Sequence, residues 1–152
     1  MTVTQAPLFG VEQAERTSDD VYTPAWIFEQ LGLTFDLDVA SPPGGIPWIP
    51  AERFYTQADD GLAQPWHGCV WMNPPYSQPA AWVDRFIQHG NGIALLQVSK
   101  SKATHKIFEC ANGIHFPVPF KFANDHAIYM PVLFAAMGDD NVKALQRLGR
   151  VR

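Results

Sequence analysis

The chain has 152 residues, 47% of them hydrophobic and 17% charged, which suits one domain with a substantial core and excludes a disordered chain. It contains no apolar run near the roughly 20 residues of a membrane span, and its N-terminus lacks the basic and apolar regions of a signal peptide. We therefore expect a cytoplasmic protein with no membrane partner. Cys69 and Cys110 form no CxxC pair and the five histidines are scattered, so we expect neither a disulfide framework nor a bound metal.

The net charge of −4 conceals a difference between the two halves of the chain. Residues 1–76 hold ten acidic and two basic residues, whereas residues 77–152 hold five acidic and nine basic ones, so the halves carry −8 and +4. The second half is therefore a candidate surface for a polyanion, although an ordinary solvated surface would produce the same imbalance.

Residues 1–20 are polar and aperiodic, which predicts a loose arm before a single domain over residues 21–152. The domain opens with a short predicted helix, in which Thr23 is the N-cap, Pro24 the first helical residue and Gly32 the stop. The inner face of this helix is expected to be apolar and to consist of Trp26, Ile27, Phe28 and Leu31.

Three apolar segments, 34–40, 68–72 and 92–98, are predicted as strands, and the last reads as a central parallel strand. Asp38 and Asn73 fall at the carboxyl ends of the first two. The remaining elements are predicted as a helix between Pro79 and Gly90, a helix over 99–113 closed by Asn112 and Gly113, two late strands within 114–122 and 127–138, and a short helix over 139–149. This alternation predicts an α/β fold with a mostly parallel sheet, late antiparallel strands and a crevice at the strand carboxyl ends.

The sequence Asn73-Pro74-Pro75-Tyr76 follows the second predicted strand directly. A stiff turn would explain the prolines, but a given string of four residues arises by chance in only about one chain of this length in a thousand. Asn73 and the Pro74 carbonyl offer hydrogen-bond acceptors, and Tyr76 offers a flat ring. These groups suit the exocyclic amino group of a flipped-out base, which two acceptors can orient while the base stacks on the ring.

Four segments together resemble one family: "VYTPAWIFEQL", "FDLDVAS", "DDGLAQPW" and "VWMNPPYS". Across roughly residues 21–136 the chain resembles the phage-type DNA N6-adenine methyltransferases (Dam-like), within the class I methyltransferases that use S-adenosylmethionine. The resemblance implies a Rossmann-like fold with helices on both faces of the sheet. A chain this compact leaves little room for a separate target-recognition domain.

The resemblance also implies roles for individual residues. The catalytic loop would be Asn73, Pro74, Pro75 and Tyr76. The cofactor, S-adenosylmethionine, would lie beside Tyr22, Thr23, Pro24, Asp38 and Ala40, with Asp60 near its adenine end. Asp38 and Asp60 also suit plain turn positions, and that alternative stays open.

Two segments depart from the family pattern. The loop after the first strand, Ser41–Gly45, has two glycines but no G-x-G. Where relatives tend to carry Asp-Thr-x-Trp, this chain has "SKSKATHK", with Lys102 at about the position of the aspartate. Lys100, Lys102 and Lys106 lie within seven residues, and we expect them to contact DNA phosphates, unless they form only a solvated helix surface.

The expected reaction is direct displacement, in which adenine N6 takes the methyl group with no covalent enzyme intermediate and no metal. The expected partner is DNA with a flipped adenine, and the protein would be a monomer or a homodimer. Alternatives are another amino substrate (cytosine N4, an RNA base or a protein glutamine) and a non-catalytic nucleic-acid-binding relative. Asn73 at the head of the loop favours adenine, and neither cysteine follows a proline as cytosine C5 chemistry requires.

Overall fold

The computed structural model describes residues 21–123 and 131–152, where the strands form one mixed six-stranded sheet in the order β2-β1-β3-β4-β6-β5. The strands are β1 (Phe35–Asp38), β2 (Ala51–Phe54), β3 (Val70–Met72), β4 (Gly92–Gln97), β5 (Gly113–His115) and β6 (Val132–Met137). Strands β1 to β4 are parallel, and β6 runs antiparallel to both β4 and β5. This confirms the predicted mostly parallel sheet with late antiparallel strands. The predicted arm over 1–20 and the start of the last predicted strand lie outside the described residues.

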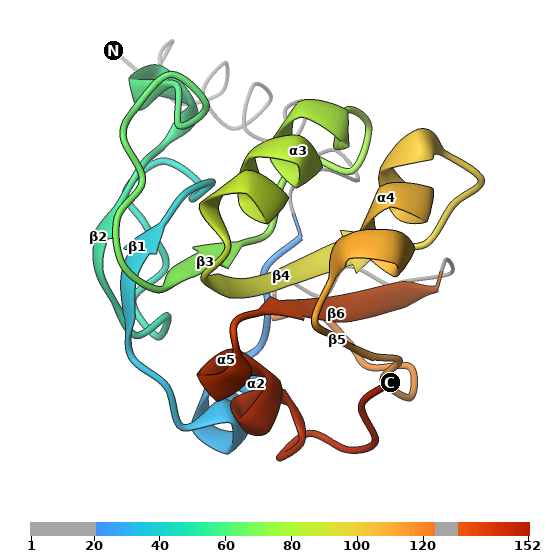
Figure 1. Cartoon of the computed structure of the whole chain (residues 1–152). Helices are drawn as coiled ribbons and strands as arrows, with labels where there is room; N and C mark the ends of the chain where they lie inside the picture. The colour runs from blue at the N-terminus through green and yellow to red at the C-terminus, as the bar shows by residue number, and fades with distance from the viewer. Residues whose placement is uncertain (1–20, 124–130) are drawn as a thin grey trace, which may run out of the picture.

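Helices cover both faces of the sheet, as expected (Figure 1). They are α2 (Ala25–Leu31), α3 (Ala80–His89), α4 (Lys102–Cys110) and α5 (Asp139–Leu145), and a short 3₁₀ helix, η2 (Gln57–Asp59), follows β2. Side chains on one face, such as Trp71, pack with α2 and α5, whereas those on the other, such as Val70, pack with α3 and α4. In the part of the chain that the structure describes, every helix falls short of the apolar length that a membrane crossing needs.

The predicted cap of the first helix is wrong. Helix α2 begins at Ala25, Pro24 occupies the N-cap position, and no side chain caps the helix. Thr23 is buried instead, and its hydroxyl has no hydrogen-bond partner within the described ranges. Gly32 ends the helix in the left-handed conformation, as predicted, with φ of 64°. Trp26, expected on the inner face, is 41% exposed.

The later elements follow the prediction with smaller corrections. Helix α3 lies between Pro79 and Gly90 as expected. Helix α4 ends earlier than predicted, with Ala111 as its C-cap, because Gly113 already begins β5. The strand expected within 114–122 is only the short β5, and the prolines that follow it have no N–H to donate to a sheet.

Strand β2 was not predicted from the sequence. Its side chains are mostly exposed, and Glu52 and Arg53 interrupt any apolar alternation. It lies at the edge of the sheet and pairs with β1 alone, so backbone hydrogen bonds rather than side-chain burial hold it. Charged side chains on such an edge discourage pairing with another chain.

The strand order reverses direction between β1 and β3, which lie side by side with Asp38 opposite Trp71. In open α/β sheets, ligands bind outside the carboxyl ends of the strands at such a switch point. Asp38 ends β1, and Asn73 directly follows β3. The fold therefore brings these two side chains, 35 positions apart in the sequence, to the carboxyl ends of two neighbouring parallel strands.

Candidate active site

The side-chain amide of Asn73 has a fixed orientation. Its Nδ2 donates a hydrogen bond to the Val21 carbonyl at 2.9 Å, across 52 positions of sequence. Its Oδ1 is buried and, within residues 21–123 and 131–152, has no hydrogen-bond partner. Turning the amide over would place its oxygen against the Val21 carbonyl oxygen, so Asn73 presents an acceptor to the site.

Two further oxygens share this condition. The buried side-chain oxygens and nitrogens without a partner, within the ranges that the structure describes, are Thr23 Oγ1, Asn73 Oδ1 and Tyr76 OH. All three belong to the two segments that the hydrogen bond to Val21 joins. Since buried polar groups in folded proteins nearly always have partners, three oxygens in one region without a partner among the described residues make this region a candidate ligand site.

The segment before α2 is held through its backbone. The Tyr22 carbonyl accepts a hydrogen bond from the Ala123 N–H at 2.8 Å, and the Thr23 carbonyl accepts one from Trp48 Nε1 at 2.8 Å, in addition to the bond from Asn73. Three consecutive carbonyls are thus fixed by three distant parts of the chain. The sequence could not predict that Trp48 holds this segment, because its partner is a backbone carbonyl, which every residue has.

Asp38 is a buried carboxyl group, 3% exposed. Burial raises its pKa to about 7, and the hydrogen bond that Asp38 accepts from the Ala40 N–H at 3.2 Å offsets this only in part. The salt bridge among the described residues joins Lys106 to Asp84, so no cation of the described structure pairs with Asp38. A buried carboxylate without a cation is unfavourable, so this site favours a positively charged ligand group.

The loop after β1 forms a tight turn of its own. Gly45 donates its N–H to the Pro42 carbonyl at 3.0 Å, and Gly44 has a φ of 81°, which suits glycine. Ser41 is buried and donates its N–H to the Tyr55 carbonyl, which continues the pairing of β1 with β2. The two glycines therefore serve a turn.

Asp60 lies in the loop after β2 and directly follows the short helix η2, but the aspartate whose side chain takes part in capping this helix is Asp59. Asp59 forms a reciprocal capping box with Thr56. Asp60 has a φ of 57°, in the left-handed region, and is exposed. The next residue, Gly61, packs so closely on the chain after β1 that an added Cβ would lie 2.2 Å from the Val39 carbonyl oxygen. Asp60 is therefore held beside the carboxyl end of β1.

The three predicted phosphate-binding lysines differ in their surroundings. Lys100 and Lys102 are exposed at the start of α4, beyond the carboxyl end of β4. Lys106 forms a salt bridge with Asp84 at 2.6 Å, and this hydrogen bond raises the pKa of Lys106. Lys106 therefore carries its own counter-ion, whereas Lys100 and Lys102 form no such pair in the described structure.

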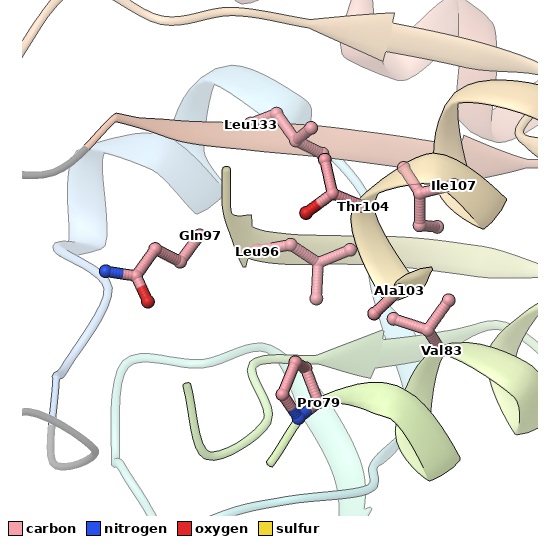
Figure 2. Close-up of a pocket in the computed structure, with 8 residues that line it drawn as sticks. All are labelled: Pro79, Val83, Leu96, Gln97, Ala103, Thr104, Ile107 and Leu133. Carbon is pink, nitrogen blue, oxygen red and sulfur yellow. The ribbon is translucent and has the colours of Figure 1, made fainter. Parts of the chain in front are cut away.

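A small apolar pocket lies between α3 and α4 at the carboxyl end of β4 (Figure 2). It is lined by Pro79, Val83, Leu96, Gln97, Ala103, Thr104, Ile107 and Leu133. Most of these side chains pack on the α3 and α4 face, whereas Tyr76 packs with the opposite face, so the pocket is separate from the three unpartnered oxygens. No group of metal-ligating side chains occurs in the regions that the structure describes.

Comparison with known proteins gives two matches. The sequence profile of the family described as DNA N-6-adenine-methyltransferase (Dam) matches residues 11–116, which include every candidate site residue named above. The chain is also similar to the DNA N-6-adenine-methyltransferase of Haemophilus phage HP1 (strain HP1c1), at 31% identity over 83 residues. That match covers 49% of this chain and 46% of the phage protein, so the chain aligns with less than half of that relative's length.

The unpartnered Tyr76 hydroxyl predicts an unusual stability effect. Tyr76→Phe removes a desolvated group that makes no hydrogen bond in the described structure, so the free energy of unfolding should stay the same or rise by up to about 1–3 kcal/mol. The matched control is Tyr55→Phe, which loses a hydrogen bond to the Pro65 carbonyl and should lower that free energy by about 0.5–1.5 kcal/mol. Urea denaturation of both variants tests this, and a clear loss of stability in Tyr76→Phe would contradict it.

The buried Asp38 carboxyl predicts a pH-dependent difference. Its pKa in the folded protein, about 7, lies above the ordinary value of 3.8, so its contribution to stability is present below about pH 4 and is lost as the pH rises through 7. Asp38→Asn should therefore match the parent near pH 4 and exceed it at pH 8 by up to about 4 kcal/mol. Urea denaturation at the two pH values measures this. The control, Asp84→Asn at an exposed site, should show a difference of less than about 1 kcal/mol.

Proposed function

The chain belongs to the DNA N-6-adenine-methyltransferase (Dam) family, and from that premise we propose that it transfers a methyl group from S-adenosylmethionine to the N6 amino group of adenine in DNA. The observation that carries the proposal is the Asn73 amide, whose nitrogen is engaged by the Val21 carbonyl and whose oxygen is buried without a partner in the described ranges. An acceptor held in this way suits an N–H of an exocyclic amino group.

In the proposed reaction, the adenine N6 lone pair would form the new nitrogen–carbon bond while the sulfur–methyl bond of the donor breaks with its electron pair staying on sulfur. S-adenosylhomocysteine would be the leaving group, and N6 would then lose a proton to solvent. Asn73 Oδ1 accepts a hydrogen bond from N6, which orients the lone pair and stabilises the positive charge that grows on nitrogen. Pro74 and Pro75 keep the backbone of this loop rigid, so little reorganisation is needed when the base arrives. S-adenosylmethionine, when bound, supplies the electrophilic methyl group on a sulfonium centre.

The residues at the switch point fit this cofactor chemically. S-adenosylmethionine carries an ammonium and a sulfonium group, and a buried carboxyl at Asp38 would gain a cationic partner from either. The Thr23 hydroxyl, which has no partner among residues 21–123 and 131–152, would gain a hydrogen bond. We assign the cofactor to Tyr22, Thr23, Pro24, Asp38 and Ala40, with Asp60 at its adenine end.

Tyr76 is proposed to stack on the flipped adenine. Its side chain is half-buried and packs against the core on the α2 face. Burial also raises the pKa of its hydroxyl, so the ring stays neutral at any physiological pH. Because the prolines hold the backbone, stacking then requires the Tyr76 side chain to rotate so that a ring face points toward the crevice when the base binds.

Label transfer tests the proposed reaction. The protein is incubated with tritiated S-adenosylmethionine and duplex DNA, and the DNA is digested to nucleosides. The label should comigrate with N6-methylated deoxyadenosine. Label on cytosine would support the other amino substrate, and binding of DNA without any label transfer would support a non-catalytic relative.

Replacing Asn73 should remove catalysis while leaving the fold. In Asn73→Ala the acceptor aimed at N6 is lost, and turnover should fall by about two to three orders of magnitude. The matched control is Asn112→Ala, which removes an exposed side-chain hydrogen bond to the Gly138 N–H and should keep parental turnover. Thermal unfolding of both variants checks the fold, and parental activity in Asn73→Ala would rule out the mechanism.

DNA binding should depend on Lys100 and Lys102. Two phosphate contacts contribute about −1.8 to the log–log salt slope, so raising the salt from about 50 to 200 mM weakens their share of the affinity about 12-fold. The double variant Lys100→Ala, Lys102→Ala should bind DNA more weakly and with a shallower slope. Lys143→Ala, on α5 at the opposite face, is the control. An unchanged slope in the double variant would show that phosphates are bound elsewhere.

A further inference from the structure

Arg85, on α3, holds the loop between β2 and β3 at three points. Its Nη1 donates a hydrogen bond to the Leu62 carbonyl, and its Nη2 donates one to the Gln64 carbonyl at 2.6 Å. Its guanidinium carbon also lies 4.8 Å from the centre of the Trp66 ring. A planar guanidinium can make two directed hydrogen bonds and a ring contact at once, so one side chain fixes this stretch of loop to α3.

Hydrogen bonds inside the loop carry this attachment toward β1. Trp66 Nε1 donates to the Gly61 carbonyl at 2.8 Å, and Gln64 Nε2 donates to the Asp59 carbonyl at 2.8 Å. Asp60, the proposed contact to the adenine end of the cofactor, lies between these two carbonyls in the chain. The residues that Arg85 anchors are therefore bonded to both neighbours of Asp60.

The loop also contacts the end of β1 directly. A Cβ built on Gly61 would lie 2.2 Å from the Val39 carbonyl oxygen and 3.2 Å from the Trp82 ring. Val39 follows Asp38, the buried carboxyl group of the proposed cofactor site. The position of the loop thus sets the space next to Asp38.

We propose that Arg85 is a positioning residue for cofactor binding: it holds the 60–66 loop against the carboxyl end of β1 and so shapes the cofactor site without touching the cofactor. This inference rests on the proposed function, because it takes Asp38 and Asp60 as cofactor contacts. Arg85 itself contacts carbonyls and an indole ring, and none of these belongs to the catalytic loop.

Arg147 provides a matched control. Like Arg85, it donates a hydrogen bond from its guanidinium to a backbone carbonyl, that of Leu31. This contact joins the chain after α5 to the end of α2, where the chain is about to enter β1 at its amino end. Removing either arginine should lower stability, but only the loss of Arg85 should change the cofactor site.

The experiment measures the dissociation constant of S-adenosylhomocysteine by calorimetry, together with thermal unfolding, for the parent, Arg85→Ala, Arg85→Lys and Arg147→Ala. Both Arg85 variants should bind S-adenosylhomocysteine about tenfold or more weakly than the parent. Alanine removes the guanidinium, and the single ammonium of lysine cannot reproduce its two directed hydrogen bonds. Arg147→Ala should keep parental affinity. With saturating cofactor and DNA, the turnover number of Arg85→Lys should stay within about twofold of the parent while its KM for S-adenosylmethionine rises.

A double variant tests the route through Asp60. If Arg85 acts by placing the loop, Arg85→Lys should weaken binding less in an Asp60→Ala background than in the parent. Parental affinity in both Arg85 variants, or full additivity with Asp60→Ala, would overturn the inference. Failure of the parent to bind S-adenosylhomocysteine would instead overturn the proposed function, so the two failures are distinguishable. Should Arg85→Ala not fold, Arg85→Lys, which keeps the charge and most of the stem, decides the outcome.

Discussion

The hydrogen bond from Asn73 to the Val21 carbonyl is the contact on which the site depends. Its net contribution to stability is modest, about 0.5–1.5 kcal/mol, as for any neutral hydrogen bond. Its larger effect is on orientation, because it fixes which end of the amide faces the crevice. It also ties the loop after β3 to the segment before α2, so a proline-stiffened loop and a segment held through three carbonyls restrain one another.

Buried polar groups without partners among the described residues lower the stability of this part of the fold. Each buried oxygen without a partner costs about 1–3 kcal/mol, and Asp38 adds the cost of a desolvated carboxyl. A ligand that supplies a cation to Asp38 and hydrogen-bond partners to Thr23 and Asn73 would remove these costs on binding. Groups left unsatisfied among the described residues would thus contribute binding energy to such a ligand, which gives a physical reason for the failure of local sequence rules at this site.

The elements that sequence reasoning identified correctly carry strong local signals. Gly32 and Gly90 end their helices in the left-handed conformation, and apolar runs mark the central strands. Thr23 shows the limit of such rules, since a threonine before a proline and an apolar helix matches an N-cap, yet its hydroxyl caps nothing and is buried without a partner in the described ranges. Strand β2 carries no signal at all, because an edge strand held by backbone pairing needs no apolar pattern.

The contacts that organise the site were beyond sequence reasoning for a related reason. Asn73, Trp48 and Arg85 are recognisable side chains, but each bonds to a backbone carbonyl, and nearly every position in a chain offers one. Their partners become specific only when the fold brings distant segments together. At position 21 the two parts of the residue have different roles. The buried Val21 side chain must fit its place in the core, whereas the Val21 carbonyl orients Asn73. A substitution at position 21 can preserve the site as long as the backbone keeps its place. At position 73, glutamine is the one substitution that keeps both the N–H donor and the oxygen acceptor of the amide, and its longer side chain would move the oxygen.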